Sequence, residues 1–203
     1  MKKTTLRSFL TRTTDLAACA LALAFLALPA LAQAPDGATA NPLSTWLKNA
    51  YRNNHREMLG AAEKMPEEFY GMRPGPQQEV RTFGQQVLHY VQFNYLWCAQ
   101  AKGEKNPNAG NDLNKLTAKA DILKAFNDAF AYCEPVYNSL TDSSGAETIE
   151  NTLENGRQIR SLRSALLIQN WGHNSEIYGL MTAYMRMKSI VPPSSEPRGG
   201  RGR

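Results

Sequence analysis

The chain has 203 residues, with 23 Lys and Arg against 18 Asp and Glu, and hydrophobic residues make up 42% of it. This length suits one domain of ordinary size. Most of the net charge of +5 lies at the two ends, because four basic residues precede position 13 and three arginines stand among the last six positions. The basic composition therefore does not indicate a nucleic-acid surface, and we expect no nucleic-acid partner.

The N-terminal segment, residues 1–32, is typical of a secretory signal peptide. A basic stretch precedes an almost wholly apolar run over residues 16–31, and an Ala-Leu-Ala motif ends at Ala32. Small residues at this spacing fit a signal peptidase, so we predict cleavage after Ala32 and a periplasmic or extracellular protein. An uncleaved anchor is the alternative. The run is shorter than the roughly 20 residues that cross a bilayer, so we expect no membrane span in the mature protein.

The rest of the chain is predicted to be one domain at residues 41–193. A flexible lead-in at residues 33–40 precedes it, and a Gly- and Arg-rich tail at residues 194–203, expected to be disordered, follows it. Inside the domain, apolar residues recur at helical spacing in four segments. These segments span residues 42–64, 82–101, 118–140 and 161–188. Their apolar stripes need partners, so we predict an all-α fold, a four-helix bundle with long connections after helices 1 and 2.

Several residues predict how these helices begin, bend and end. Asn41 is suited to cap the first helix, and Gly103 is suited to end the second. Pro135 lies inside the third helix, where proline bends the backbone. The Asn155-Gly156 pair follows an apolar segment and precedes another, which favours a small β-hairpin before the fourth helix.

Two cysteines, Cys98 and Cys133, remain after the predicted cleavage. An oxidising compartment permits a disulfide between them. Two buried thiols are the alternative, because pairing requires Cα atoms within about 7 Å and the sequence alone gives no such distance.

Three motifs together give the chain a resemblance to a known family. The segment after the first helix reads Met-Pro-Glu-Glu-Phe-Tyr-Gly-Met-Arg-Pro over residues 65–74. The second helix opens with Thr-Phe-Gly-Gln-Gln-Val-Leu-His at residues 82–89, and the fourth contains His-Asn-Ser-Glu-Ile-Tyr-Gly at residues 173–179. With the Pro-Pro exit near residue 193, this combination resembles the DinB-like family over residues 42–195.

The resemblance implies a four-helix bundle that often binds a divalent metal (Zn, Ni, Mn or Fe). The family's usual ligands are one histidine on the second helix and two on the fourth, spaced His-x3-His. Some members transfer low-molecular-weight thiols, and many have no assigned activity. The pattern carries over to His89 and His173, which are expected to meet inside the bundle. It fails at Ile177, where the second histidine of the pair would stand.

This departure leaves the predicted site with two histidines. Residues four apart share a helix face, so a His-x3-His pair can hold one ion, whereas isoleucine has no donor atom. Glu176 is a candidate substitute that would give a set of two histidines and one carboxylate. His55 on the first helix is another candidate for the third group. The competing interpretation is that His89 and His173 are core histidines held by hydrogen bonds.

Three classes of function follow from the sequence. The first is a metalloenzyme, of transferase or hydrolase type, acting on a small molecule through His89, His173 and Glu176. The second, favoured because the departure falls on a ligand position, is a non-catalytic exported bundle that binds a small molecule in a degenerate metal pocket. The third is a haem-binding bundle with His and Met ligands. The sequence contains no Cys-x-x-Cys-His motif, so a haem would not be attached covalently. A small-molecule ligand is the expected partner, and a homodimer remains open.

Overall fold

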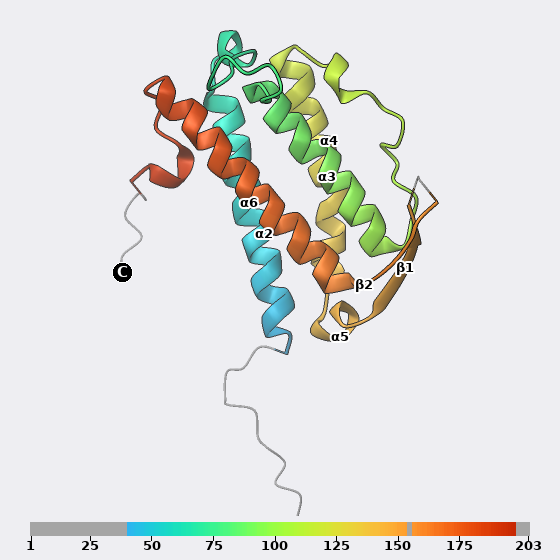
Figure 1. Cartoon of the computed structure of the whole chain (residues 1–203). Coiled ribbons are helices and arrows are strands. Elements are labelled where there is room, and N and C mark those ends of the chain that lie inside the picture. The colour runs from blue at the N-terminus through green and yellow to red at the C-terminus, as the bar shows by residue number, and fades with distance from the viewer. Residues whose placement is uncertain (1–39, 154–155, 198–203) are drawn as a thin grey trace, which may run out of the picture. The chain divides into compact units, whose positions relative to one another are not determined.

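The computed structural model describes residues 40–153 and 156–197, so the predicted signal peptide and all but the last residue of the lead-in lie outside the described residues. Four long helices dominate (Figure 1): α2 (Pro42–Lys64), α3 (Phe83–Lys102), α4 (Lys119–Ser139) and α6 (Arg163–Met187). Helices α2 and α3 each pack against both α4 and α6. The predicted all-α four-helix bundle is therefore confirmed. Within the described residues, no helix is both long and apolar enough to cross a membrane.

The ends of α3 follow from its sequence. The Thr82 hydroxyl accepts a hydrogen bond from the Gln85 backbone N–H, and the Gln85 side chain accepts one from the Thr82 N–H. This capping box satisfies two of the backbone donors that a helix start leaves free. At the other end Gly103 adopts a left-handed conformation with a φ of 73°, as predicted for the residue that ends the helix.

The predicted cap on α2 is wrong. The Asn41 side chain makes no capping hydrogen bond to its own helix and instead accepts one from the Asp142 backbone N–H. The Asp142 carboxylate takes the capping role, because its oxygens accept from the Leu43 and Ser44 N–H groups at 3.3 and 2.7 Å. Asp142 opens the short helix α5 (Asp142–Gly145), 98 positions along the chain from Ser44. No local sequence pattern predicts a capping residue so far along the chain.

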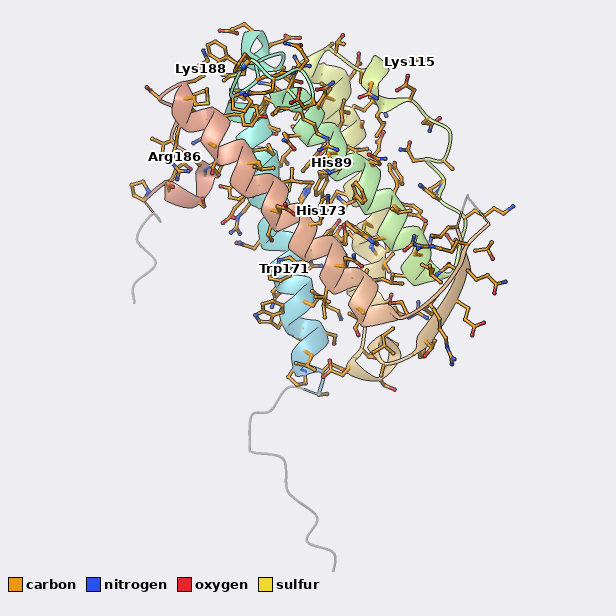
Figure 2. The ribbon with its side chains drawn as sticks, viewed as in Figure 1. His89, Lys115, Trp171, His173, Arg186 and Lys188 are labelled. Carbon is orange, nitrogen blue, oxygen red and sulfur yellow. A yellow bond between two sulfur atoms is a disulfide. The ribbon has the colours of Figure 1, made fainter. Side chains whose placement is uncertain are left out.

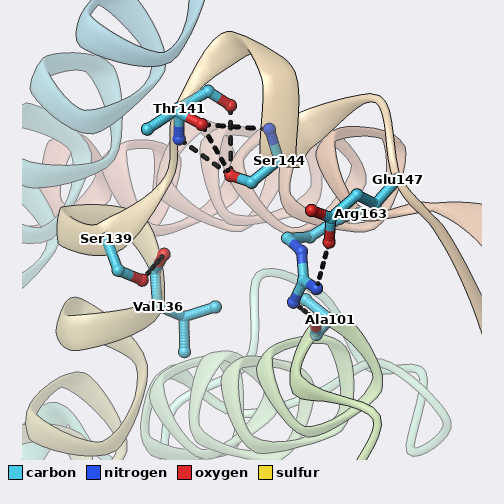
Figure 3. A network of polar contacts seen from close by, with 7 residues as sticks. All are labelled: Ala101, Val136, Ser139, Thr141, Ser144, Glu147 and Arg163. Atoms are coloured by element: carbon cyan, nitrogen blue, oxygen red, sulfur yellow. Dashed lines mark hydrogen bonds and ion pairs between the residues drawn. The ribbon is translucent and has the colours of Figure 1, made fainter.

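The predicted hairpin is confirmed, and because of it the fourth helix begins later in the chain than predicted. Strand β1 (Thr148–Thr152) pairs antiparallel with β2 (Gln158–Leu162), and Gly156 has a φ of 79° in the turn. Because β2 uses residues 158–162, α6 begins at Arg163 rather than at residue 161. Figure 3 shows Arg163 joining the hairpin to α3: its guanidinium pairs with Glu147 at 2.9 Å and donates to the Ala101 carbonyl.

The interior consists of two apolar clusters with a polar layer between them. The cluster at one end includes Met58, Phe83 and Ile177, and the other includes Trp97 and Leu167. The buried polar side chains between them on α3 and α6 are Asn94, Asn170 and Asn174. In the second cluster, Cys98 and Cys133 form a disulfide between α3 and α4, with Cα atoms 5.4 Å apart. This resolves the alternative that the sequence left open.

The C-terminal segment is ordered further than predicted. Residues Pro193–Ser195 form a short 3-10 helix, η3, and Tyr178 of α6 holds it. The Tyr178 hydroxyl accepts from the Ser194 N–H and donates to the Ser194 hydroxyl, both at 2.9 Å. Lys64 pairs with Glu196. A disordered tail from residue 194 is thus wrong for residues 194–197, because these contacts fix them, and residues 198–203 lie outside the described residues.

Candidate functional site

His89 and His173 meet between α3 and α6 (Figure 2). Their Nε2 atoms are 3.1 Å apart, which is a hydrogen-bond distance. Both rings are half-buried. Aromatic edges enclose His173, with Phe93 and Trp97 at centroid distances of 4.6 and 5.2 Å. The meeting of two imidazoles from separate helices, which the family resemblance implied, is therefore present, whereas metal binding by them stays a prediction.

Glu176 lies beside the pair but does not complete it. Its Oε2 atom is 3.5 Å from Nδ1 of His173, the ring nitrogen that does not face His89. Its side chain is 72% exposed. Within residues 40–153 and 156–197, no three His, Cys, Asp or Glu side chains are grouped so that they could hold a metal ion. Glu176 therefore lies next to the outer nitrogen of His173 and away from the side on which the two Nε2 atoms meet.

The environment keeps both imidazoles uncharged at neutral pH. Burial, followed by the charges of Arg81 and His173, lowers the pKa of His89 to about 4. Burial also lowers the pKa of His173, although the Glu176 carboxylate opposes that shift. A neutral imidazole has one N–H donor and one acceptor nitrogen. A proton on Nδ1 of His173, facing Glu176, leaves its Nε2 free to accept from the Nε2–H of His89.

Ile177 stands one helical turn after His173 and supplies no donor. It is 1% exposed and belongs to the apolar cluster that also contains Leu88, the neighbour of His89 in sequence. Residues four apart on a helix share a face, so Ile177 extends the His173 face into the core. At this position of the helix the chain therefore offers a buried aliphatic side chain in place of a donor atom.

His55 is not part of the site. Its ring stacks on Phe130 and Phe126 of α4, at centroid distances of 3.5 and 5.1 Å, and its Nδ1 lies 3.3 Å from the Tyr90 hydroxyl. Among the described residues, no contact joins His55 to His89 or His173. The prediction of His55 as a third metal ligand is therefore wrong, because its side chain on α2 packs against the aromatic side chains of α4.

A polar pocket of about 490 Å³ opens beside His89. The segment before α3 forms one wall with Arg73, Glu79 and Arg81, and the loop at residues 106–114 forms the opposite wall. Gln85, Leu88, His89 and Gln92 of α3 form its floor. Small-molecule sites are usually concave and mostly apolar with a few convergent polar groups; this pocket has the concave form, the polar groups and a histidine of lowered pKa, but a largely polar lining.

Sequence reasoning missed both walls of this pocket. The sequence analysis predicts only long connections after helices 1 and 2, with no role for the residues in them. The available signal was the repetition of asparagine at positions 106, 108, 111 and 114. Side-chain amides both donate and accept hydrogen bonds, so a run of asparagines is compatible with a solvent-exposed loop and with a ligand-binding loop. The sequence alone does not distinguish these alternatives.

A buried asparagine layer underlies the histidine pair, and it too was missed. Asn94 of α3 accepts hydrogen bonds through Oδ1 from Asn170 at 2.8 Å and from Asn174 at 3.3 Å, both of α6. Tyr51 of α2 donates to the same oxygen at 3.4 Å. These bonds satisfy some of the buried polar groups and fix the register of α3 against α6, whereas Asn94 Nδ2 and Asn174 Oδ1 are buried without a partner among the described residues. The two helices thereby hold His89 and His173 next to each other, with their ring planes inclined by 73°.

Comparison with known proteins agrees with this architecture. A family model described as the DinB superfamily matches residues 50–174. A DinB-like protein from Bacillus cereus has a similar fold, with a TM-score of 0.56 and 14% identity over 72% of this chain and 93% of the other. A DinB-like protein from Bacillus subtilis has a TM-score of 0.56 and 15% identity, covering 75% and 99% of the two chains. No curated protein has a sequence that matches this chain.

Proposed function

The chain belongs to the DinB superfamily, and from this premise we propose that it is a non-catalytic member that binds a small polar molecule in the pocket beside the His89–His173 pair. The observation that carries the proposal is the position of His89. One ring nitrogen of His89 engages His173, while the residue itself lines the pocket of about 490 Å³. A site of this volume accepts a metabolite-sized molecule.

The donor atoms do not fit the metal site implied by the family. That site needs three protein donors, so that an ion is held and one position stays open. Here two imidazoles face each other, the carboxylate of Glu176 approaches the far nitrogen of His173, and Ile177 is aliphatic. Two neutral nitrogens make a weak site, so the proposed function uses no metal.

A metal-dependent enzyme is the second candidate, and one observation favours it. A carboxylate on the Nδ1 side of a histidine whose Nε2 faces inward is the arrangement that orients metal-bound histidines in many proteins. His89 and His173 would then be the ligands, with Glu176 behind the second. This candidate requires a third donor from outside the described histidines and carboxylates.

Metal analysis of the purified, untagged protein separates the two candidates. We expect less than stoichiometric Zn, Ni, Mn and Fe, and no change in the thermal unfolding midpoint when a chelator is added. A bound metal stabilises the folded state by mass action, so removal of a tightly held ion would lower that midpoint. Stoichiometric metal together with a lowered midpoint would establish the second candidate instead.

Binding itself is testable by NMR with a library of small polar molecules, both uncharged and anionic. We expect hits whose backbone-amide shifts centre on the pocket, at His89, Gln92 and Leu113, and His89→Ala should weaken those hits. Arg160→Gln, on the hairpin, is the matched control and should leave them unchanged. Hits that occur only outside the pocket, or none at all, would contradict a ligand-binding function.

We also propose that the protein acts outside the cytoplasm. Two features support this: the basic and apolar N-terminal segment ending at Ala32, and the Cys98–Cys133 disulfide, a bond typical of oxidising compartments. Fractionation of cells that express the full chain, with N-terminal sequencing of the mature product, tests both parts. A cytoplasmic protein that keeps its first 32 residues would contradict the proposal.

A further inference from the structure

The charged residues of the pocket define a class of ligand. We infer that the pocket binds small molecules that carry an oxyanion, carboxylate or phosphate, and that Arg73 and Arg81 are the binding residues. This inference rests on the ligand-binding function proposed above and adds the ligand's chemistry to it. Both arginines line the wall opposite the asparagine-rich loop, and His89 lies between the walls.

Arg81 is an exposed cation without a counter-ion among the described residues. Its backbone carbonyl accepts a hydrogen bond from the Tyr184 hydroxyl at 2.5 Å, which anchors the chain just before α3. Among the described residues, its guanidinium has no ion pair or hydrogen-bond acceptor. A guanidinium stays charged at every physiological pH and offers five N–H donors, so it suits a planar oxyanion. The charge of Arg81 also reaches the histidine pair, where it lowers the pKa of His89.

Arg73 is oriented by its own linker. Its Nε donates to the Val80 carbonyl at 2.8 Å, and that bond leaves both terminal nitrogens of the guanidinium available. A side chain already held in place loses less conformational freedom when a ligand binds. Arg73 and Arg81 thus form one wall with two positive groups, of which at least one is positioned in advance.

The pocket also contains two acidic side chains, as many as its arginines. Glu79 and Asp112 also line it, but in the part of the chain that the structure describes neither forms an ion pair with Arg73 or Arg81. Asp112 instead accepts a hydrogen bond from the Asn114 N–H at 3.1 Å, which places it at the start of a 3-10 turn in the opposite wall. These carboxylates disfavour ligands with several negative charges, because like charges repel across a partly dry pocket.

Amide groups complete the recognition. Gln85 and Gln92 from α3 and Asn106, Asn108 and Asn111 from the loop supply uncharged donors and acceptors. Such groups bind the uncharged polar part of a ligand and fix its orientation. The expected ligand therefore has one oxyanion and a polar, hydrogen-bonding remainder.

NMR titrations of the purified protein with three probes test the inference. The probes are succinamate, which carries one carboxylate, its uncharged analogue succinamide, and inorganic phosphate. We expect both anions to shift the amides around Arg81 and His89, and succinamide to bind at least about tenfold more weakly, since a charge-assisted hydrogen bond contributes roughly a factor of ten or more. The tighter of the two anions identifies carboxylate or phosphate as the preferred group. Added NaCl should weaken the anions, because it screens the attraction.

Variants assign the effect to the pocket. Arg81→Gln should lower anion affinity about tenfold or more, whereas Arg160→Gln on the hairpin should leave it unchanged. Arg73→Gln provides a second variant if Arg81→Gln unfolds. Succinamide binding as tightly as succinamate, or Arg81→Gln and Arg73→Gln that both keep full affinity, would overturn the anion inference. The function proposed above survives that result if the uncharged library molecules still bind the pocket, and falls only if they do not.

Discussion

His55 illustrates how one residue's surroundings decide its chemistry. Its ring belongs to an aromatic stack with Phe130 and Phe126 and makes a single polar contact, with Tyr90. Burial lowers the pKa of His55 from 6.5 to about 4. A histidine in such a position favours the folded state only while it is uncharged.

The His55 environment predicts a loss of stability in acid. Because the folded-state pKa is lowered, the unfolded chain binds this proton more readily than the folded one between pH 6.5 and about 4. Its contribution is therefore complete above pH 6.5 and is lost as the pH falls toward 4. His55→Phe retains the stack and removes the titration, so its free energy of unfolding should decline less than that of the wild type between pH 7.5 and 4.5.

Urea unfolding of both proteins at several pH values measures this difference. His89 and His173 also have lowered pKa values, so part of the acid sensitivity should remain in the variant. Parallel pH profiles for wild type and His55→Phe would mean that His55 does not titrate as its burial requires.

At the scale of elements, local sequence patterns predicted most helix and strand positions. They did not predict contacts between residues far apart in the chain. Helical periodicity predicted α2 over residues 42–64, the range observed, and the Asn-Gly pair predicted the hairpin. The fourth helix was predicted two residues too early because Ser161 and Leu162 extend β2. The prediction that Asn41 caps α2 was wrong because the Asn41 side chain accepts a hydrogen bond from the Asp142 N–H, 101 positions away. No local sequence pattern includes that partner.

The disulfide between α3 and α4 predicts a redox-dependent stability. It joins residues 35 positions apart and lies in the apolar cluster of one end, where Asn170 approaches both sulfurs at 3.5 and 3.7 Å. A crosslink over such a loop restricts the unfolded chain and typically contributes about 2–4 kcal/mol. Reduction should therefore lower the urea midpoint of the wild type.

The control is a Cys98→Ala, Cys133→Ala double variant, which should unfold at a lower urea concentration than the oxidised wild type and should not respond to reductant. Thiol counting in the unfolded, unreduced protein checks the bond directly, with an expected value near zero for the predicted mature chain. Two free thiols, or a wild-type midpoint that is indifferent to reductant, would contradict a stabilising role.

At the scale of the whole molecule, the candidate site joins predicted and unpredicted parts. His89 and His173 were identified because the motifs around them resemble a family with known ligand positions, and packing of α3 against α6 brings them together. A pocket at the metal position was predicted, but the walls of the observed pocket were not, since they come from two irregular connections whose approach depends on tertiary packing. The asparagine layer was hidden as well, because Asn94 pairs with Asn170 and Asn174 across 76 and 80 positions.

The central claim, that the two-histidine pair lost metal binding with its third donor, is tested most directly by calorimetric titration of Zn²⁺ into wild type and Ile177→His. Ile177 shares the helix face of His173, so histidine there restores a three-nitrogen set. We predict weak binding by the wild type and a gain of at least about tenfold in the variant, given that even outer-shell changes alter affinity 10–100-fold. Tight, stoichiometric binding by the wild type, or equal affinities in two folded proteins, would contradict the claim.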